Sequence, residues 1–116
     1  MVKQDIILDK LFHALADPTR RAMLAHLSRS ERSIGELAAP HEMSLTAVSK
    51  HVRVLEEAGL VKRRVEGRSH ILNIEPQAMK SAEQWLTSRR TMWERHFDQL
   101  ESYLAATEPQ PKGDKK

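Results

Sequence analysis

Residues 44–74 read SLTAVSKHVRVLEEAGLVKRRVEGRSHILNI, and their pattern is the strongest indication of the fold in this chain. The first half of this stretch places apolar residues at helical spacing and reaches Gly59, a residue type that commonly ends helices. Its second half holds two β-rich runs, 60–65 and 68–74, around a turn that contains Gly67. Two such runs around a glycine turn are typical of a β-hairpin. The stretch therefore predicts a helix followed directly by a hairpin.

Three shorter helices are predicted before this stretch. Apolar residues recur at helical spacing over residues 5–15. A second helix begins at Asp17-Pro18, since an aspartate accepts hydrogen bonds from free N–H groups and proline needs none at the first helical position. A third begins where Ser33 and Glu36 have the spacing of a capping box, and Pro40 ends it. With the helix that follows, this third helix forms a helix-turn-helix candidate.

The helix predicted over residues 44–58 has two unlike faces. An apolar face predicts burial and consists of Leu45, Val48, Val52 and Leu55. On the opposite face, hydroxyls and Lys50 suit contact with base edges of DNA, and Arg53 suits a phosphate. A solvent-facing helix would have a similar surface, but no acidic residue interrupts this face before Glu56. The residues predicted to face DNA on this helix are Ser44, Thr46, Ala47, Ser49, Lys50 and Arg53.

Basic residues concentrate around this helix and the hairpin. The net charge is +3, and residues 44–70 hold six basic residues against three acidic ones, which accounts for the whole excess. Cations displace condensed counterions from a duplex, so this surface suits double-stranded DNA, although on charge alone a solvated face is an equal alternative. Arg63, Arg64 and Arg68 are predicted to lie along the DNA backbone or minor groove. The order of helix, turn, helix and basic hairpin favours DNA binding.

The chain resembles the ArsR-type family of bacterial winged-helix repressors. The resemblance rests on LADPTRR (15–21), LTAVSKH (45–51) and LEEAGLV (55–61), and it extends over residues 12–103. It implies a mainly α fold with a small β-hairpin, the winged helix-turn-helix, with N- and C-terminal helices that form a homodimer on an inverted-repeat operator. By motif, the resemblance adds His51 to the residues predicted to face DNA.

This family is best known for sensing metals, but the present sequence offers few residues that could bind one. Cysteine is absent, which excludes thiolate sites. The final helix offers only His96 where the family's site needs two histidines, and the chain resembles the branch without metal sites, in which the last helix carries tryptophans such as Trp85 and Trp93. We expect no metal and no cofactor. A metal- or small-molecule-responsive regulator with its effector site at the dimer interface stays open as an alternative.

Other functional classes find less support. No phosphate-binding loop, paired buried carboxylates or nucleophile beside a base stands out, so the chain is not expected to be an enzyme. A winged helix used only for protein interaction is a further alternative, which the basic hairpin disfavours. The sequence identifies no effector ligand.

The last helix is predicted to run from Pro76 to about Ala105, with one apolar stripe. About 30 helical residues span roughly 45 Å, more than a domain of this size covers, so part of the stripe should pack on a second subunit. The first helix is apolar as well. The predicted dimer-interface residues are Ile7, Leu8, Leu11, Leu86, Trp93, Phe97, Leu100 and Leu104.

The length of 116 residues predicts one folding unit, residues 1–106. Residues 107–116 lack an apolar anchor and are expected to form a disordered tail. No window approaches the roughly 20 apolar residues of a membrane span, and the N-terminus lacks the layout of a secretory signal. The protein is therefore expected in the cytoplasm, without a membrane partner.

Overall fold

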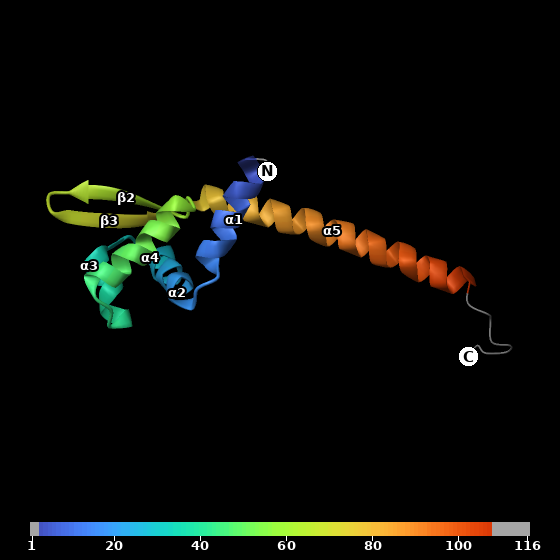
Figure 1. Ribbon diagram of the computed structural model, residues 1–116, viewed down its shortest axis with the longest axis horizontal. Helices are drawn as coiled ribbons and strands as arrows, with labels where there is room; N and C mark the ends of the chain where they lie inside the picture. Colours follow the sequence, from blue (N-terminus) through green and yellow to red (C-terminus); the bar gives the residue numbers. More distant parts are fainter. Residues whose placement is uncertain (1–2, 108–116) are drawn as a thin grey trace. The chain divides into compact units, whose positions relative to one another are not determined.

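A computed structural model of the chain describes residues 3–107 (Figure 1). These residues form two compact units that divide after Ala82. The boundary between the units lies inside the last helix, and Thr107 still belongs to this helix. The rest of the predicted tail, residues 108–116, lies outside the described residues. The elements are α1 (Lys3–Leu15), α2 (Pro18–Arg29), β1 (Arg32–Ser33), α3 (Ile34–Ala38), a 3-10 turn η1 (Ala39–His41), α4 (Leu45–Glu57), β2 (Val61–Glu66), β3 (Ser69–Ile74) and α5 (Pro76–Thr107).

The predicted helix starts are confirmed by their capping contacts. The Asp17 carboxylate accepts a hydrogen bond from the backbone N–H of Arg20 at 3.0 Å. Ser33 and Glu36 form the reciprocal capping box, at 2.8 and 3.1 Å. The Ser44 hydroxyl caps α4. Each cap satisfies N–H groups that have no partner inside the helix, so these residues set where the helices begin.

The hairpin of β2 and β3 is also confirmed, and a short third strand joins it. Glu66 pairs with Ser69, which leaves a two-residue turn in which Gly67 has a φ of 60°, the conformation that favours glycine. The strand β1 pairs with β3 in the antiparallel order β1-β3-β2. This two-residue strand was not expected from the sequence, because it is too short to show an alternating pattern.

The core of the first unit lies between α1, α2, α3, α4 and the sheet. Its largest fully buried side chains are Leu11, Met23, Leu37, Val48, Val52, Leu55, Leu60 and Leu72. The predicted apolar face of α4 is thus right at three positions and wrong at Leu45, which is 59% exposed. Because helical side chains lean toward the N-terminus, the first residue of α4 extends past the end of the helix and away from the core.

Two predicted dimer-interface residues belong to this core instead. Leu11 is fully buried and Leu8 is 7% exposed, because α1 packs its inner face against α2 and α4. A side chain that is already covered within one chain offers no area to a second copy. Of the three α1 residues predicted at the interface, Ile7 alone is exposed. Its neighbour Ile6, which was not part of that prediction, is exposed as well.

None of the helices within residues 3–107 combines the length and the apolar character that crossing a membrane requires.

Candidate DNA-binding surface

The outer face of α4 carries exposed polar and basic side chains. Thr46, Lys50 and Arg53 are exposed, and at about 100° per residue they share an arc of roughly 60°; we call this set the outer arc of α4. Ala47 and Ser49 are half-buried beside it. Among the described residues, neither Lys50 nor Arg53 has an ion-pair partner. The outer arc can therefore meet an anion without first breaking a contact.

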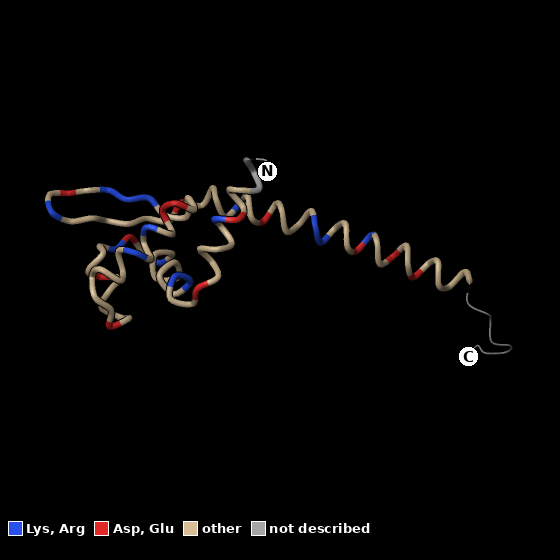
Figure 2. The backbone as a smooth tube through the Cα atoms, viewed as in Figure 1, with Lys and Arg blue, Asp and Glu red and all other residues tan. Residues whose placement is uncertain are grey.

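The hairpin is basic, but most of its cations are already paired. Figure 2 shows the basic residues along β2 and at the tip of the hairpin. The pairs are Lys62–Glu75 at 2.7 Å, Arg63–Glu56 at 2.9 Å, Arg64–Glu66 at 2.7 Å and Arg64–Glu31 at 3.0 Å. Within the described part of the chain, Arg68 at the tip has no such partner. Of the three hairpin arginines predicted to face DNA, only Arg68 is thus unpaired.

These ion pairs shift the pKa values of their members. The guanidinium of Arg64 lowers the pKa of Glu31 through a hydrogen bond, and the two carboxylates raise the pKa of Arg64. The hydrogen bond between Lys62 and Glu75 raises the pKa of the lysine and lowers that of the glutamate. Exposed pairs of this kind add little stability. They nevertheless compete with any phosphate that approaches the same cation.

A groove of about 420 Å³ lies between α4, the start of α3 and the hairpin. We call it the wing groove. Hydroxyls and guanidinium groups line much of it, and Leu45 adds an apolar wall. Its polar lining consists of the hydroxyl residues Ser33, Ser49 and Ser69 and the arginines Arg63 and Arg68. Glu56 already holds the Arg63 guanidinium, so among the described residues the hydroxyls and Arg68 are the donors available to a backbone phosphate of DNA.

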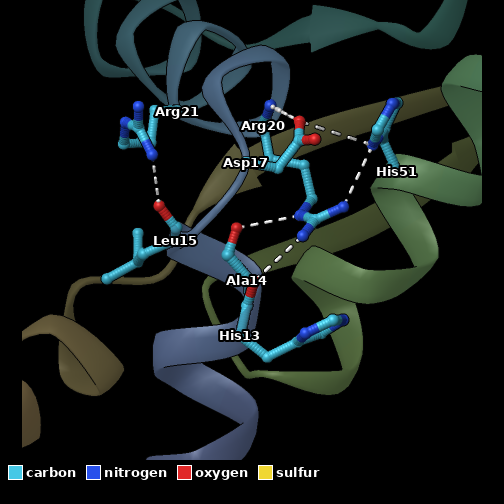
Figure 3. Close-up of polar contacts among 7 residues, drawn as sticks. All are labelled: His13, Ala14, Leu15, Asp17, Arg20, Arg21 and His51. Atoms are coloured by element: carbon cyan, nitrogen blue, oxygen red, sulfur yellow. Dashed lines mark hydrogen bonds and ion pairs between the residues drawn. The ribbon is translucent and has the colours of Figure 1, made fainter.

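His51, predicted to face DNA, turns toward the corner between α1 and α2 instead (Figure 3). Its Nδ1 lies 3.3 Å from Nη1 of Arg20 and 4.0 Å from the Asp17 carboxylate, and its side chain is 22% exposed. One residue along a helix changes the direction of a side chain by about 100°, which separates His51 from Lys50. In this structure His51 thus faces Arg20 and Asp17 rather than the outer arc, and its contact with DNA stays a prediction.

Arg20 is a functional candidate that the sequence reasoning missed. The residue is 9% exposed, and its guanidinium donates to the backbone carbonyls of Ala14 at 2.8 Å and His13 at 2.9 Å. Burial of a charged side chain requires such compensation. The only available signal in the sequence was its place directly after the capped start of α2, within LADPTRR.

In the second unit, α5 exposes a row of large apolar side chains. Leu86, Trp93, Phe97, Leu100 and Leu104 are 46–64% exposed. Trp93 and Leu86 line a shallow cavity of about 300 Å³. Trp85 is half-buried, with the guanidinium carbon of Arg89 at 5.1 Å from the centre of its ring.

The described residues hold no group of three or more histidine, aspartate or glutamate side chains placed to bind a metal ion. His96 packs beside the ring of Phe97. The rings of His26 and His41 pack edge to face, with their centres 5.6 Å apart. Two imidazoles alone fall short of the four ligands of a structural zinc site.

A helix-turn-helix followed by a basic antiparallel hairpin defines a winged helix-turn-helix protein, a class that binds DNA. A family model for a helix-turn-helix domain matches residues 15–64. The chain is 38% identical over 71 residues to the HTH-type transcriptional regulator Rv2034 of Mycobacterium tuberculosis, covering 61% of this chain and 66% of that protein. It is 37% identical over 73 residues to the transcriptional repressor SmtB homolog of Synechocystis sp., covering 56% of this chain and 55% of that protein.

A solved structure extends the likeness over most of the chain. The crystal structure of the ArsR family transcriptional regulator RHA00566 is 38% identical, has a TM-score of 0.75, and covers 81% of this chain and 97% of that one. The chain belongs to the ArsR family of transcriptional regulators. It spans less than two thirds of the length of each of the two curated relatives. These proteins regulate transcription and are not enzymes, so the predictions of a DNA-binding regulator and of no catalytic activity are confirmed.

Proposed function

We propose that the chain is a homodimeric repressor that binds an inverted-repeat operator through α4. The observation that carries this proposal is the outer arc, Thr46, Lys50 and Arg53, which is exposed and has no acidic partner among the described residues. In the major groove, the hydroxyl of Thr46 and the ammonium of Lys50 would reach base edges. Arg53 would hold a phosphate and set the register.

The hairpin would contact the DNA backbone beside α4, the proposed recognition helix. Arg68 is the residue best placed for this role, because no carboxylate of the described chain occupies its guanidinium. The wing groove, with Ser49 and Ser69 on its walls, would receive the phosphate that lies between α4 and the hairpin. Arg64 would contribute only after it exchanges a carboxylate for a phosphate.

Dimerisation is proposed from the apolar row on α5. Side chains such as Trp93 and Phe97 leave 60% and 64% of their surface exposed, and contiguous apolar surface of this kind marks an interaction site. A second copy would cover it with the same residues, since a two-fold interface pairs a patch with itself. Two recognition helices would then read half-sites about one helical turn apart.

Repression would follow from occupancy, because a dimer that covers a promoter excludes the polymerase. The relative from Synechocystis sp. is named a transcriptional repressor, which supports this direction of control. As a regulator of bacterial promoters, the protein would work in the cytoplasm, where the DNA is.

The experiment is selection of bound fragments from sheared genomic DNA at physiological salt, with light scattering on the purified protein. We expect a two-fold symmetric motif and the mass of a dimer. Lys50→Ala should no longer select fragments that carry the motif. Lys80→Ala, which removes an exposed lysine from α5, should still select them. Motif-free retention that salt removes would instead mean non-specific attraction, and would favour a protein-interaction module.

A further inference from the structure

Polar contacts hold α4 on two flanks. His51 and Glu56 lie five residues apart, about 140° around the helix axis at about 100° per residue. They flank the buried face of α4, which contains Val52, and the outer arc lies on the opposite side. Each of the two contacts a different arginine from a different part of the fold.

On the first flank, Arg20 ties α4 to the corner between α1 and α2 (Figure 3). Its Nη1 lies 3.3 Å from Nδ1 of His51, while Nε and Nη2 donate to the carbonyls of Ala14 and His13 at the end of α1. Because a guanidinium can only donate, a hydrogen bond between these two atoms requires Nδ1 of His51 to accept, which places the ring proton on Nε2.

On the second flank, Arg63 ties α4 to the hairpin. Its Nε and Nη2 donate to the two carboxylate oxygens of Glu56, both at 2.9 Å, and its Nη1 lies 3.0 Å from Nδ1 of His70 on β3. A bidentate pair restricts the direction of approach as well as the distance. The flank is thus fixed to β2 and β3 together.

We propose that Arg20 and Arg63 are positioning residues that fix the rotation of α4 about its axis, so that His51 and Glu56 govern operator binding without touching DNA. A rotation of about 20° would move a side chain at the helix surface by about 2 Å, enough to break a hydrogen bond to a base. This inference rests on the proposed binding of an operator by α4.

The test compares two variants at His51, whose side chain is partly exposed and thus tolerant of change. His51→Asn keeps an acceptor near the position of Nδ1, and His51→Leu removes it. On the duplex selected from genomic DNA, we expect the affinity of His51→Leu to fall about tenfold. Nη1 of Arg20 loses its acceptor in this variant, so the rotation of α4 is no longer fixed on that flank. His51→Asn should stay within about twofold of the wild type.

Two further variants separate positioning from direct contact. Arg63→Lys keeps the charge but loses the bidentate geometry, so a positioning role predicts weaker operator binding with an unchanged salt slope. Arg21→Ala is the matched control, since Arg21 donates to the carbonyl of Leu15 in the same corner and, among the described residues, makes no hydrogen bond or ion pair with α4. The control should bind the duplex like the wild type.

Three results would overturn the inference. The first is wild-type affinity in His51→Leu, and the second is wild-type affinity in Arg63→Lys. The third is a shallower salt slope in His51→Leu, because that result would place His51 on a phosphate. Nitrogen NMR of wild-type His51 at pH 8 needs no variant, and a proton on Nδ1 would contradict the Arg20 contact. If the wild type selects no duplex, the proposed function fails, whereas the NMR result still decides the contact.

Discussion

Glu31 holds Arg64 with both of its carboxylate oxygens, at 3.0 and 3.1 Å, although 33 residues separate them in the sequence. Glu66 accepts from Nε of the same guanidinium at 2.7 Å. Arg64, which the sequence predicts to face DNA, is therefore the hairpin cation with the most carboxylate partners. Competition between these carboxylates and DNA phosphates leads to the first prediction.

Removing the charge of Glu31 should strengthen DNA binding. In Glu31→Gln, Arg64 keeps only Glu66 as a partner, so its charge becomes more available to a phosphate. We expect higher affinity for any duplex and a steeper dependence of the binding constant on salt, by up to about 0.9 in the log–log slope. Fluorescence anisotropy over a salt series measures both. The same gain in a Glu31→Gln, Arg64→Ala double variant would show that Arg64 is not its source.

Arg68→Ala should weaken binding more than Arg64→Ala does. Arg68 has no carboxylate partner among the described residues, so its removal loses a phosphate contact, and the salt slope should fall by about 0.9. Loss of Arg64 also releases two carboxylates, and its slope should change less. The same salt titration decides the order, and a larger effect at Arg64 would contradict the assignment of the hairpin tip.

Lys50→Ala should reduce specificity more than overall affinity. A lysine that contacts a base edge contributes about 1–3 kcal/mol of discrimination, so affinity for the selected operator should fall about tenfold or more, while affinity for a scrambled duplex should fall little. Competition binding with the two duplexes measures the ratio. Equal losses on both would place Lys50 on a phosphate instead.

Asp17→Ala should destabilise the fold by about 1 kcal/mol at pH 7, because α2 loses its N-cap. The hydrogen bond from the backbone N–H of Arg20 holds the pKa of Asp17 below its ordinary value of 3.8. A lowered folded-state pKa means that this stabilisation is complete above the unfolded value and is lost as the pH falls through the folded value. Urea unfolding at pH 7 and near pH 3 should therefore give a smaller difference between variant and wild type at the lower pH.

Trp93→Ala should impair dimerisation without unfolding the first unit. The side chain is 60% exposed, so its truncation leaves no cavity within the chain but removes a large apolar contact from the proposed interface. Sedimentation should detect monomer at concentrations where the wild type is dimeric. Met92→Ala, at the next position and 49% exposed, serves as the control. A dimer of unchanged affinity in Trp93→Ala would remove this residue from the interface.

Local features of the fold were predictable because each depends on residues a few positions apart. The cap at Asp17, the capping box of Ser33 and Glu36, and the turn at Gly67 satisfy backbone groups or conformations in their own neighbourhood. The helix of residues 45–57 follows from its apolar spacing. The burial predicted for its apolar face was wrong only at Leu45, where the helix begins.

Short-range spacing and motifs encode the winged helix-turn-helix, the exposed arc of α4 and the family, so these could be predicted from the residues alone. Three features came from the packing: Leu11 fills the core, His51 faces Arg20, and Arg64 is bound by Glu31 while Arg68 has no ion pair within the described residues. These outcomes depend on which surfaces meet when elements distant in sequence pack together. Burial and charge compensation are properties of that packing, and no local pattern encodes them.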